Sequence, residues 1–353
     1  MSVETPLPDM SVEEAGRTAG RVLEEVGRAV VGHRDGLRLV LATVLAGGHV
    51  LLEDLPGLGK TLAARSLATA LGLDFARAQF TPDLLPADLT GSYLFHQHSG
   101  EMVFRPGPVH TQVLLADEIN RTPPKTQAAL LEAMQERQVT VEGVTHPLGS
   151  PFVVLATANP VEHEGTYPLP EAQLDRFLTR VSFGYPAADD ELDVVLRRVA
   201  RRREEVALDA VTDAEGVLAM QACVETVGVE ESVGRYCVDL AAATRAHRDT
   251  AVGASPRGSL ALVLLARAWA LLEGRAQRAV QAVLEVELAV PVHDVGEEVP
   301  VERGVLVEQS AEPERVLGGD QLVEAHLARG QGGPVAGRES VLGVGAPVAD
   351  PLE

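Results

Sequence analysis

The sequence predicts an α/β fold built on a parallel sheet, followed by a second domain that consists of helices alone. Short apolar runs bounded by turn residues recur through the first half of the chain, and amphipathic patterns of helical period fill most of the gaps between them. Strands that alternate with helices in this way form parallel sheets covered on both faces. After Pro186 the strand-like runs stop and only helical periodicity continues, which indicates the second domain.

The sheet and the helices that cover it are expected at regular distances along the chain. Strands are predicted over residues 49–53, 74–80, 113–117, 151–157 and 178–183. Helices are predicted over residues 11–30, 34–45, 61–71 and 125–136. Residues 89–97 and 102–105 are two further strand-like runs joined by a turn that contains Gly100, so they are predicted to form a hairpin that projects from this layer.

The second domain is expected to contain four helices. They are predicted over residues 189–206, 213–226, 231–248 and 256–273. The last of them opens with Ser255 and Pro256, a typical start because serine caps a helix and proline fits its first position. The predicted organisation is an N-terminal helix, an αβα core and a helical domain, over residues 1–30, 31–186 and 187–274 respectively.

The remaining residues, 275–353, differ from the rest of the chain in composition. They contain no lysine, phenylalanine, tyrosine or tryptophan. Without aromatic side chains this stretch has little to anchor a core, so we expect an atypical, disordered tail. We interpret the abrupt change as that of a frameshift product or an unrelated extension, with a divergent but genuine C-terminus as the alternative.

Composition excludes several classes of protein. The chain of 353 residues, 46% of them apolar, is long enough for two packed domains. It carries 51 acidic and 30 basic residues, and this net charge of −21 disfavours nucleic acid or an anionic membrane as partner. Its two cysteines cannot form a disulfide framework and fit a reducing compartment. The longest apolar run, 260–272, is broken by Arg267, so no membrane span is predicted and we expect a cytoplasmic protein.

The strongest chemical signal is a glycine-containing segment, residues 53–61, between a predicted strand and a predicted helix. Gly57 and Gly59 allow the backbone to wrap a phosphate with its N–H groups pointing inward, at the positive end of the following helix. Lys60 can reach the outer phosphates, and the hydroxyl of Thr61 can bind Mg²⁺. The alternative is a glycine-rich turn before a helix, which the Gly-Lys-Thr sequence in this context makes the weaker interpretation.

A second signal is the buried strand over 113–117, which ends in two acidic residues. We expect Asp117 to hold Mg²⁺ through water and Glu118 to polarise the attacking water. Taken alone, the pair could be solvated acids at a strand end. Its combination with the phosphate loop favours a nucleotide-hydrolysing site.

Three further polar residues are candidates for the same site. Asn159 follows the strand over 151–157, where an amide can orient a water near the γ-phosphate, although an asparagine before proline is also a common turn residue. Arg176 could supply charge to the nucleotide of a neighbouring subunit, or form an ordinary helix salt bridge. Arg257 opens the last helix of the second domain, where it could sense the γ-phosphate.

Together these segments resemble the MoxR-type AAA+ ATPases. The resemblance is carried by residues 53–61, 80–91, 115–121, 124–134, 156–160 and 171–177, and it runs from about Val31 to Gly274. In the usual phosphate-loop pattern a glycine stands where this chain has Asp54. Aspartate is usual at that position in this family, so Asp54 is compatible with the resemblance.

The resemblance implies a five-stranded P-loop AAA+ core with a C-terminal all-helical lid, in an oligomeric ring that is usually a hexamer. It implies hydrolysis of ATP with Mg²⁺, chaperone-like remodelling of partner proteins, and partners with a von Willebrand factor A domain. The hairpin resembles the insertion that projects toward the ring's pore in this clade. The part of the chain after residue 275 departs from the family, which usually continues with a final lid helix.

The resemblance also assigns roles to residues. Glu118 belongs to the catalytic pair, Asn159 is the first sensor, Arg257 is the second sensor, and Arg176 is the arginine finger, with Arg180 as a weaker candidate. Thr61 and Asp117 are assigned to Mg²⁺. The ATP-binding residues would be Val31, Gly32, Asp54, Leu55, Pro56, Gly57, Leu58, Gly59, Lys60, Thr61 and Leu62.

Three other functions stay open from the sequence. The chain could be the ATPase subunit of a metal chelatase, which shares the fold. It could be a DNA-directed AAA+ motor, but that would need a basic hairpin, and residues 102–105 contain one arginine and follow Glu101. It could also be a nucleotide-binding but inactive fragment if the lid is incomplete.

Overall fold

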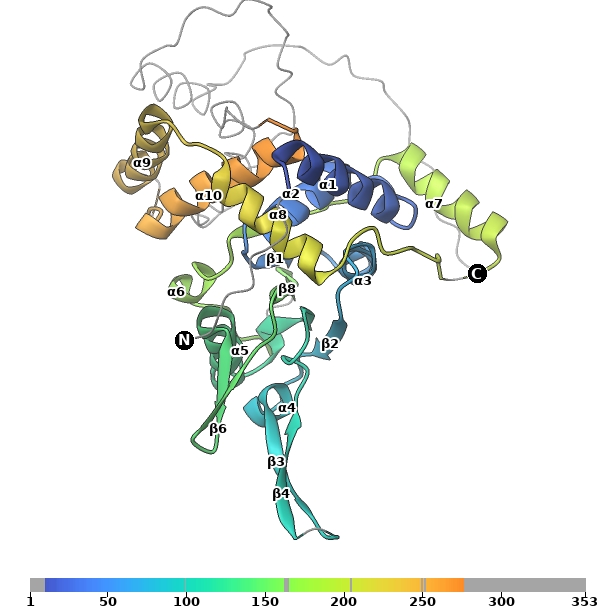
Figure 1. Ribbon diagram of the computed structural model, residues 1–353, viewed down its shortest axis with the longest axis vertical. Coiled ribbons are helices and arrows are strands. Elements are labelled where there is room, and N and C mark those ends of the chain that lie inside the picture. The colour runs from blue at the N-terminus through green and yellow to red at the C-terminus, as the bar shows by residue number, and fades with distance from the viewer. Residues whose placement is uncertain are drawn as a thin grey trace, which may run out of the picture. The chain divides into compact units, whose positions relative to one another are not determined.

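A computed structural model describes residues 10–275, except residues 99, 162–164, 204, 249 and 251 (Figure 1). The predicted tail, apart from Arg275, therefore lies outside the described residues, as do residues 1–9. In the part of the chain that is described, no helix combines the length and apolar character needed to span a membrane.

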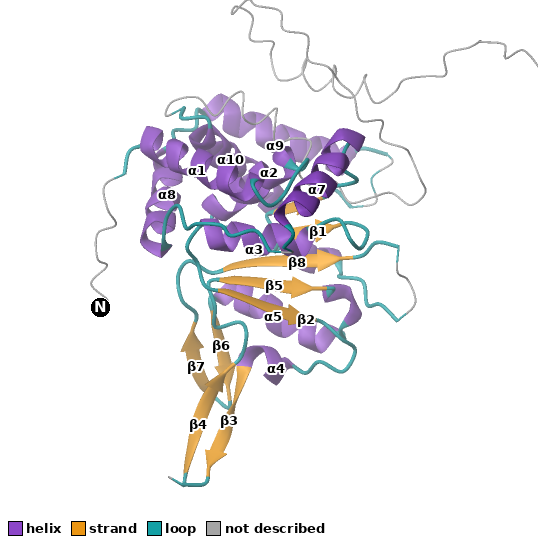
Figure 2. Cartoon of the chain, turned by 90° about the vertical axis from the view of Figure 1, so that its right-hand side faces the viewer, coloured by secondary structure: helices purple, strands orange, loops and turns teal. Residues whose placement is uncertain are grey.

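The centre of the fold is a five-stranded parallel sheet, as predicted (Figure 2). Its strands are β1 (Val50–Glu53), β2 (Phe75–Gln79), β5 (Val113–Asp117), β8 (Val153–Ala158) and β9 (Thr179–Val181). They are ordered β2-β5-β8-β1-β9, so β1 lies between β8 and β9. Every residue of β5 and β8 is buried, which explains why these two runs are apolar without alternation.

Successive residues of these strands face two separate apolar clusters. On β5, Leu115 lies in a cluster with the helices of one face, and Leu114 lies in the cluster on the other face. On β8, Leu155 and Val154 are divided in the same way. This period of two is what a strand buried on both faces requires. The helices around the sheet are α1 (Val12–Gly27), α2 (Arg34–Leu45), α3 (Lys60–Ala70), α4 (Pro86–Thr90), the short 3₁₀ helix η1 (Ile119–Arg121), α5 (Pro124–Glu136) and α6 (Glu171–Leu174).

Two hairpins project from the sheet layer, of which the sequence predicted one. The predicted hairpin is formed by β3 (Gly91–His96) and β4 (Glu101–Pro106), which pair antiparallel. The other, β6 (Gln138–Val141) and β7 (Val144–Pro147), was not predicted. Its two-residue turn, Glu142-Gly143, has φ angles of 51° and 81°. The glycine at the second position of this turn, with β-branched residues on both sides, was the local signal for it.

The second half of the described chain is helical, as predicted. It contains α7 (Ala188–Arg201), α8 (Ala214–Thr226), α9 (Glu231–Ala246) and α10 (Pro256–Leu272). Helix α10 packs on α1, α2, α8 and α9, and one apolar cluster joins these helices to the sheet. The N-terminal helix α1, which the sequence analysis treated as a segment of its own, packs against α3 and α10. The helical segment and the core therefore share their buried interior.

Candidate functional site

The glycine-containing loop connects the carboxyl end of β1 to the start of α3, which is the context expected for a phosphate loop. Gly57 and Gly59 have φ angles of 85° and 81°, in the left-handed region that favours glycine. A Cβ atom built on either of them would meet no atom within 4 Å. Open space therefore adjoins both glycines, just before the α3 N-terminus, where an anion is favoured.

Asp54, at the first position of this loop, has its carboxylate directed away from the open space. The side chain is buried and accepts hydrogen bonds from Ser182 Oγ (2.7 Å), the backbone N–H of Phe183 (2.6 Å) and the backbone N–H of Gly184 (3.1 Å). The aspartate thus fastens the loop to the segment that follows β9. This contact gives a physical reason for aspartate at a position where the usual pattern has glycine.

Lys60 lies at the opposite end of the loop and is half-buried. Its Nζ donates hydrogen bonds to the backbone carbonyls of Asp54 and Leu55. Burial lowers the pKa of Lys60 below its ordinary value, and the carboxylates of Asp54, Asp117 and Glu118 oppose that shift. The ammonium group is therefore close to the acidic pair that the sequence analysis assigned to the same site.

Asp117 ends β5 and is held by neighbouring strands. Its Oδ1 accepts a hydrogen bond from Thr157 Oγ1 at 2.6 Å, and its Oδ2 accepts from Arg77 Nε and Nη2 at 3.0 and 2.6 Å. Thr157 lies on β8 and Arg77 on β2, the two strands that pair with β5. Nothing in the sequence singles out Arg77, because its proximity to Asp117 arises from strand pairing and not from spacing along the chain.

Glu118 is the next residue and has a φ angle of 60°, which turns the chain sharply at the end of β5. Its Oε2 accepts a hydrogen bond from Gln79 Nε2 at 2.8 Å and pairs with Arg121 Nε at 3.2 Å. Gln79 ends β2 directly beside Asp117. The carboxylate is therefore fixed at the carboxyl edge of the sheet by a residue that the sequence analysis did not identify.

Asn159 follows β8 and is also at the carboxyl edge of the sheet. Its side-chain Oδ1 accepts a hydrogen bond from the backbone N–H of Val161 at 3.2 Å, and its carbonyl oxygen accepts one from Asn120 Nδ2 at 3.3 Å. The first contact is the turn interaction that the sequence left open as the alternative. The second contact places the backbone of Asn159 beside Asn120, two residues after Glu118.

Val31 and Gly32 lie on the same side of the molecule as Asp54. Gly32 has a φ of 83°, and a Cβ atom there would come within 2.9 Å of Asp190 Oδ2. The next residue, His33, stacks on Phe183 with ring centroids 5.1 Å apart, and Phe183 is one of the residues bound by Asp54. The structure thus brings the segment before α2 next to the base of the loop.

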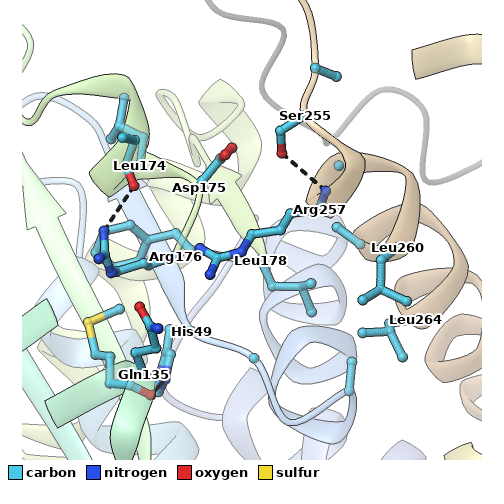
Figure 3. A pocket seen from close by; sticks show the side chains of 18 of the residues that line it. His49, Gln135, Leu174, Asp175, Arg176, Leu178, Ser255, Arg257, Leu260 and Leu264 are labelled. Atoms are coloured by element: carbon cyan, nitrogen blue, oxygen red, sulfur yellow. Dashed lines mark hydrogen bonds between the residues drawn. The ribbon is translucent and has the colours of Figure 1, made fainter. Parts of the chain in front are cut away.

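Arg176 and Arg257 line a common cavity of about 580 Å³, away from the loop (Figure 3). The cavity is also lined by His49, which precedes β1, whereas the loop follows β1. The two arginines are therefore at the amino end of β1, and the structure does not bring them to the phosphate loop of their own chain. Figure 3 shows the side chain of Arg257 extending from the start of α10 toward the segment that carries Arg176.

The hydrogen bonds of Arg176 and Arg257 leave part of their positively charged guanidinium groups available in the cavity. Arg176 Nη1 donates to the carbonyl of Ala172 at 2.9 Å, but its buried Nε has no hydrogen-bond partner among the described residues. At the start of α10, the Ser255 hydroxyl accepts a hydrogen bond from the backbone N–H of Arg257 at 3.1 Å and so caps the helix. By contrast Arg180, the weaker finger candidate, forms an ion pair with Glu53.

His49 forms the floor of this cavity and is buried. Its Nδ1 accepts the backbone N–H of Val154 at 3.0 Å, so Nε2 carries the proton and donates to the carbonyl of Met134 at 3.2 Å. Burial and, to a smaller extent, the nearby guanidinium of Arg137 lower the pKa of His49 to about 3, against the opposing effect of the Met134 bond. This histidine is therefore neutral near pH 7 and adds no charge to the cavity.

The chain is similar to known ATPases over most of its length. Residues 49–179 match the model of the ATPase family associated with various cellular activities (AAA), and residues 242–298 match the AAA lid domain. The second match continues past residue 274, where the sequence analysis placed the end of the resemblance. It thus extends into residues that the structure does not describe.

Individual relatives cover most of both chains. The uncharacterized protein YeaC of Bacillus subtilis is 51% identical over 256 residues, which are 72% of this chain and 80% of YeaC. Chaperone MoxR1 of Mycobacterium tuberculosis is 42% identical over 278 residues, 76% of this chain and 73% of MoxR1. A crystal structure from Cytophaga hutchinsonii, of a protein assigned provisionally as an ATPase, matches with a TM-score of 0.73 and 40% identity, over 79% of this chain and 87% of that one.

Proposed function

Because the chain belongs to the MoxR-type AAA+ ATPases, we propose that it hydrolyses Mg-ATP within a ring of identical chains and uses the cycle to remodel or assemble partner proteins. One observation carries the catalytic part of this proposal. The glycine loop with Lys60 and the acidic pair Asp117-Glu118 meet at the carboxyl edge of one parallel sheet. This edge is where α/β sheets bind their ligands.

The residues at this edge fit a magnesium nucleotide. The open space at Gly57 and Gly59 accommodates phosphate oxygens. Lys60 lies close enough to the carboxylates of Asp117 and Glu118 for its ammonium group to attract both them and a bound phosphate. Thr61 and Asp117 supply the oxygen ligands that Mg²⁺ prefers. The ion would neutralise charge on the phosphate oxygens during hydrolysis.

Glu118 is proposed to accept a proton from the attacking water. Gln79 and Arg121 hold its carboxylate in one position, which favours a defined direction of proton transfer. Asn159 is proposed to orient the same water from the end of β8, with its backbone tied to Asn120.

Arg176 and Arg257 are proposed to act on the nucleotide of the neighbouring chain. They line one cavity at the amino end of β1, so the phosphates of their own chain lie beyond the other end of that strand. Two guanidinium groups around one cavity are favourable when an anion lies between them. Arg180 is already paired with Glu53, which supports Arg176 as the arginine finger.

The proposed partners follow from the family. One relative is named a chaperone, which supports a remodelling role, and we propose a partner with a von Willebrand factor A domain and a location in the cytoplasm. The β3–β4 hairpin, whose tip exposes Phe95 and Met102, is proposed to face the pore of the ring.

Two inactive variants test the loop and the trans role together. The Lys60→Ala chain should fail to bind ATP, since the loop loses its only ammonium group, and the Arg176→Ala chain should bind ATP but lose turnover. An equimolar mixture should recover part of the turnover, because Lys60→Ala chains supply an intact Arg176 to the nucleotide held by Arg176→Ala chains. Turnover is measured as phosphate release, and nucleotide binding by titration with a fluorescent ATP analogue.

The control is Arg65→Ala, which removes an exposed arginine on α3 that faces Glu205. It should leave turnover unchanged. Tight nucleotide binding by Lys60→Ala would refute the phosphate loop. Mixtures that stay inactive although each chain assembles would refute the trans role of Arg176.

A further inference from the structure

Helix α7 exposes an apolar face that nothing in the described structure covers. Its residues Leu192, Val195, Leu196 and Val199 follow the spacing of one helix face, and their exposed fractions range from 52% to 67%. No residue of α7 is buried. An apolar stripe of this length usually lies against another surface, since leaving it in water gives up the free energy of burial.

The position of α7 relates this face to the nucleotide side of the chain. At the start of the helix, Asp190 lies against Gly32, and further along, Arg197 Nη1 donates to the carbonyl of Gly27 at 3.4 Å. Helix α7 thus runs beside the end of α1 and the segment before α2, which adjoin the phosphate loop through Phe183 and Asp54. Figure 1 shows it at the edge of the helical layer, with one side free.

A complementary surface lies around the cavity that holds Arg176 and Arg257. A groove of about 500 Å³ between α9 and α10 adjoins that cavity, and Leu260, which is 57% exposed, lines both. The groove is lined by four apolar side chains, by two acids and one arginine, and by two small residues, namely Val229, Val238, Leu260, Val263, Glu230, Glu231, Arg235, Gly234 and Ser259. This surface offers the apolar side chains that the α7 face requires. Its two acids outnumber its one arginine, so its net charge is opposite to that of Arg198 and Arg201 in the last turn of α7.

We propose that the apolar face of α7 of one chain packs into the α9–α10 groove of a second copy of the chain. The inference rests on the proposed function, in which Arg176 and Arg257 reach the nucleotide of a neighbour. The neighbouring chain must therefore turn its phosphate loop toward the cavity lined by Arg176 and Arg257. Helix α7 lies on the same side of that chain as the phosphate loop. The contact joins two different surfaces of identical chains, and repeated head-to-tail contacts of this kind form a ring when the rotation between neighbouring chains closes.

The first test changes the α7 face without touching the nucleotide site. The double variant Val195→Asp, Val199→Asp should have the same helix content as the wild type, measured by circular dichroism. Its single chains should also bind ATP as the wild type does. Sedimentation velocity with ATP should show single chains at concentrations where the wild type assembles, because each carboxylate would be buried against apolar side chains. The matched control is Val194→Asp, which is 46% exposed but at least about 100° around the helix from every residue of that face, and it should assemble.

The second test identifies the surface that receives α7. Val238→Asp, in the groove and outside the arginine cavity, should also give single chains. Mixed with the α7 double variant, it should give a species of two chains and nothing larger, because the mixture contains one intact α7 face and one intact groove per pair. Two chains that remain separate in this mixture would show that α7 does not bind the groove.

The outcomes separate this inference from the proposed function. A wild-type chain that stays single with ATP would overturn both the ring and this contact. A wild-type chain that assembles, together with an α7 double variant that assembles equally well, would overturn the α7 contact and leave the proposed function intact.

Discussion

At the scale of single residues, the buried polar side chains around the site are held by backbone groups and by residues from neighbouring strands. His49 uses both ring nitrogens in this way, and Asp54 and Asp117 accept several bonds each. Buried polar groups whose hydrogen bonds are all made hold side chains in fixed positions. If one partner is lost, the free energy of desolvation of the remaining group is no longer compensated. The geometry of the site therefore depends on residues that do not themselves contact a ligand.

The titration of His49 should make folding sensitive to acid. Its pKa is about 3 in the folded chain and near 6.5 when unfolded, so below pH 6.5 the unfolded chain binds a proton that the folded chain does not. The free energy of unfolding should therefore fall by about 1.4 kcal/mol per pH unit between pH 6.5 and 3 on account of this group. Urea unfolding of the wild type and of His49→Gln across this range measures the difference in slope.

The His49→Gln chain should be less stable near pH 7 but should lose less stability on acidification. His98→Gln, at an exposed position on the β3–β4 turn, serves as control and should follow the wild type. Equal slopes for all three chains would show that folding does not lower the pKa of His49.

The sequence predicted the residues that end strands or open helices, and missed those that support them. Lys60, Asp117 and Glu118 are recognisable because their spacing from a strand or a glycine is fixed along the chain. Arg77 and Gln79 are separated from the acidic pair by about forty positions and approach it only through the pairing of β2 with β5. Nothing in their local sequence indicates that pairing.

At the scale of elements, a glycine allows one connection to pass close to other backbone. Gly72 has a φ of 65°, and a Cβ atom there would lie 2.2 Å from the carbonyl oxygen of Thr212. A hydrogen bond from Val211 to Ala70 joins the same two segments. The end of α3 and the chain before α8 are therefore packed backbone to backbone. Gly143, in the turn of the second hairpin, also has a positive φ but open space around it.

Alanine variants of these two glycines distinguish the cost of a left-handed backbone conformation from the cost of a steric clash with neighbouring backbone. Gly143→Ala should reduce the free energy of unfolding by about 1–2 kcal/mol, the cost of a left-handed φ for alanine. Gly72→Ala should cost about 1–3 kcal/mol more, because the added methyl group must displace backbone. Chemical denaturation of both variants measures the difference, and equal losses would contradict the close approach at Gly72.

The elements themselves were predicted with most boundaries within a few residues. Buried parallel strands and amphipathic helices have strong periodic signals, and the Ser255-Pro256 start located α10 to the residue. The predicted helix over 189–206 ends instead at Arg201. The hairpin of β6 and β7 escaped because its strands have four residues each, too few for a clear alternation.

At the scale of the whole molecule, one apolar cluster runs from α1 through the sheet to α10. Sequence composition separates an αβ part from a helical part, but periodicity cannot show that both bury the same interior. Trp269, the single tryptophan of the chain, lies in this cluster, with Arg38 Cζ 4.5 Å from its ring centre.

Unfolding should therefore be concerted over the core and the helical segment. Trp269 fluorescence, which reports on α10, and far-ultraviolet circular dichroism, which reports on all helices and strands, should give coincident urea transitions. Leu265→Ala, at a fully buried position of α10, should shift both curves together by about 2–5 kcal/mol. A fluorescence transition at lower urea than the dichroism transition would indicate that the helical segment unfolds independently.

The hydrogen bonds of Asp54 have a mechanical consequence. They tie the root of the phosphate loop to Ser182, Phe183 and Gly184, the residues that lead out of β9 and into α7. A rearrangement of the loop backbone at residue 54 must either break these three hydrogen bonds or move residues 182–184 with it. The loop and α7 are thus coupled by a short, stiff linkage. Through it, a change in nucleotide state would exert force on the helix whose free face we assign to the next chain.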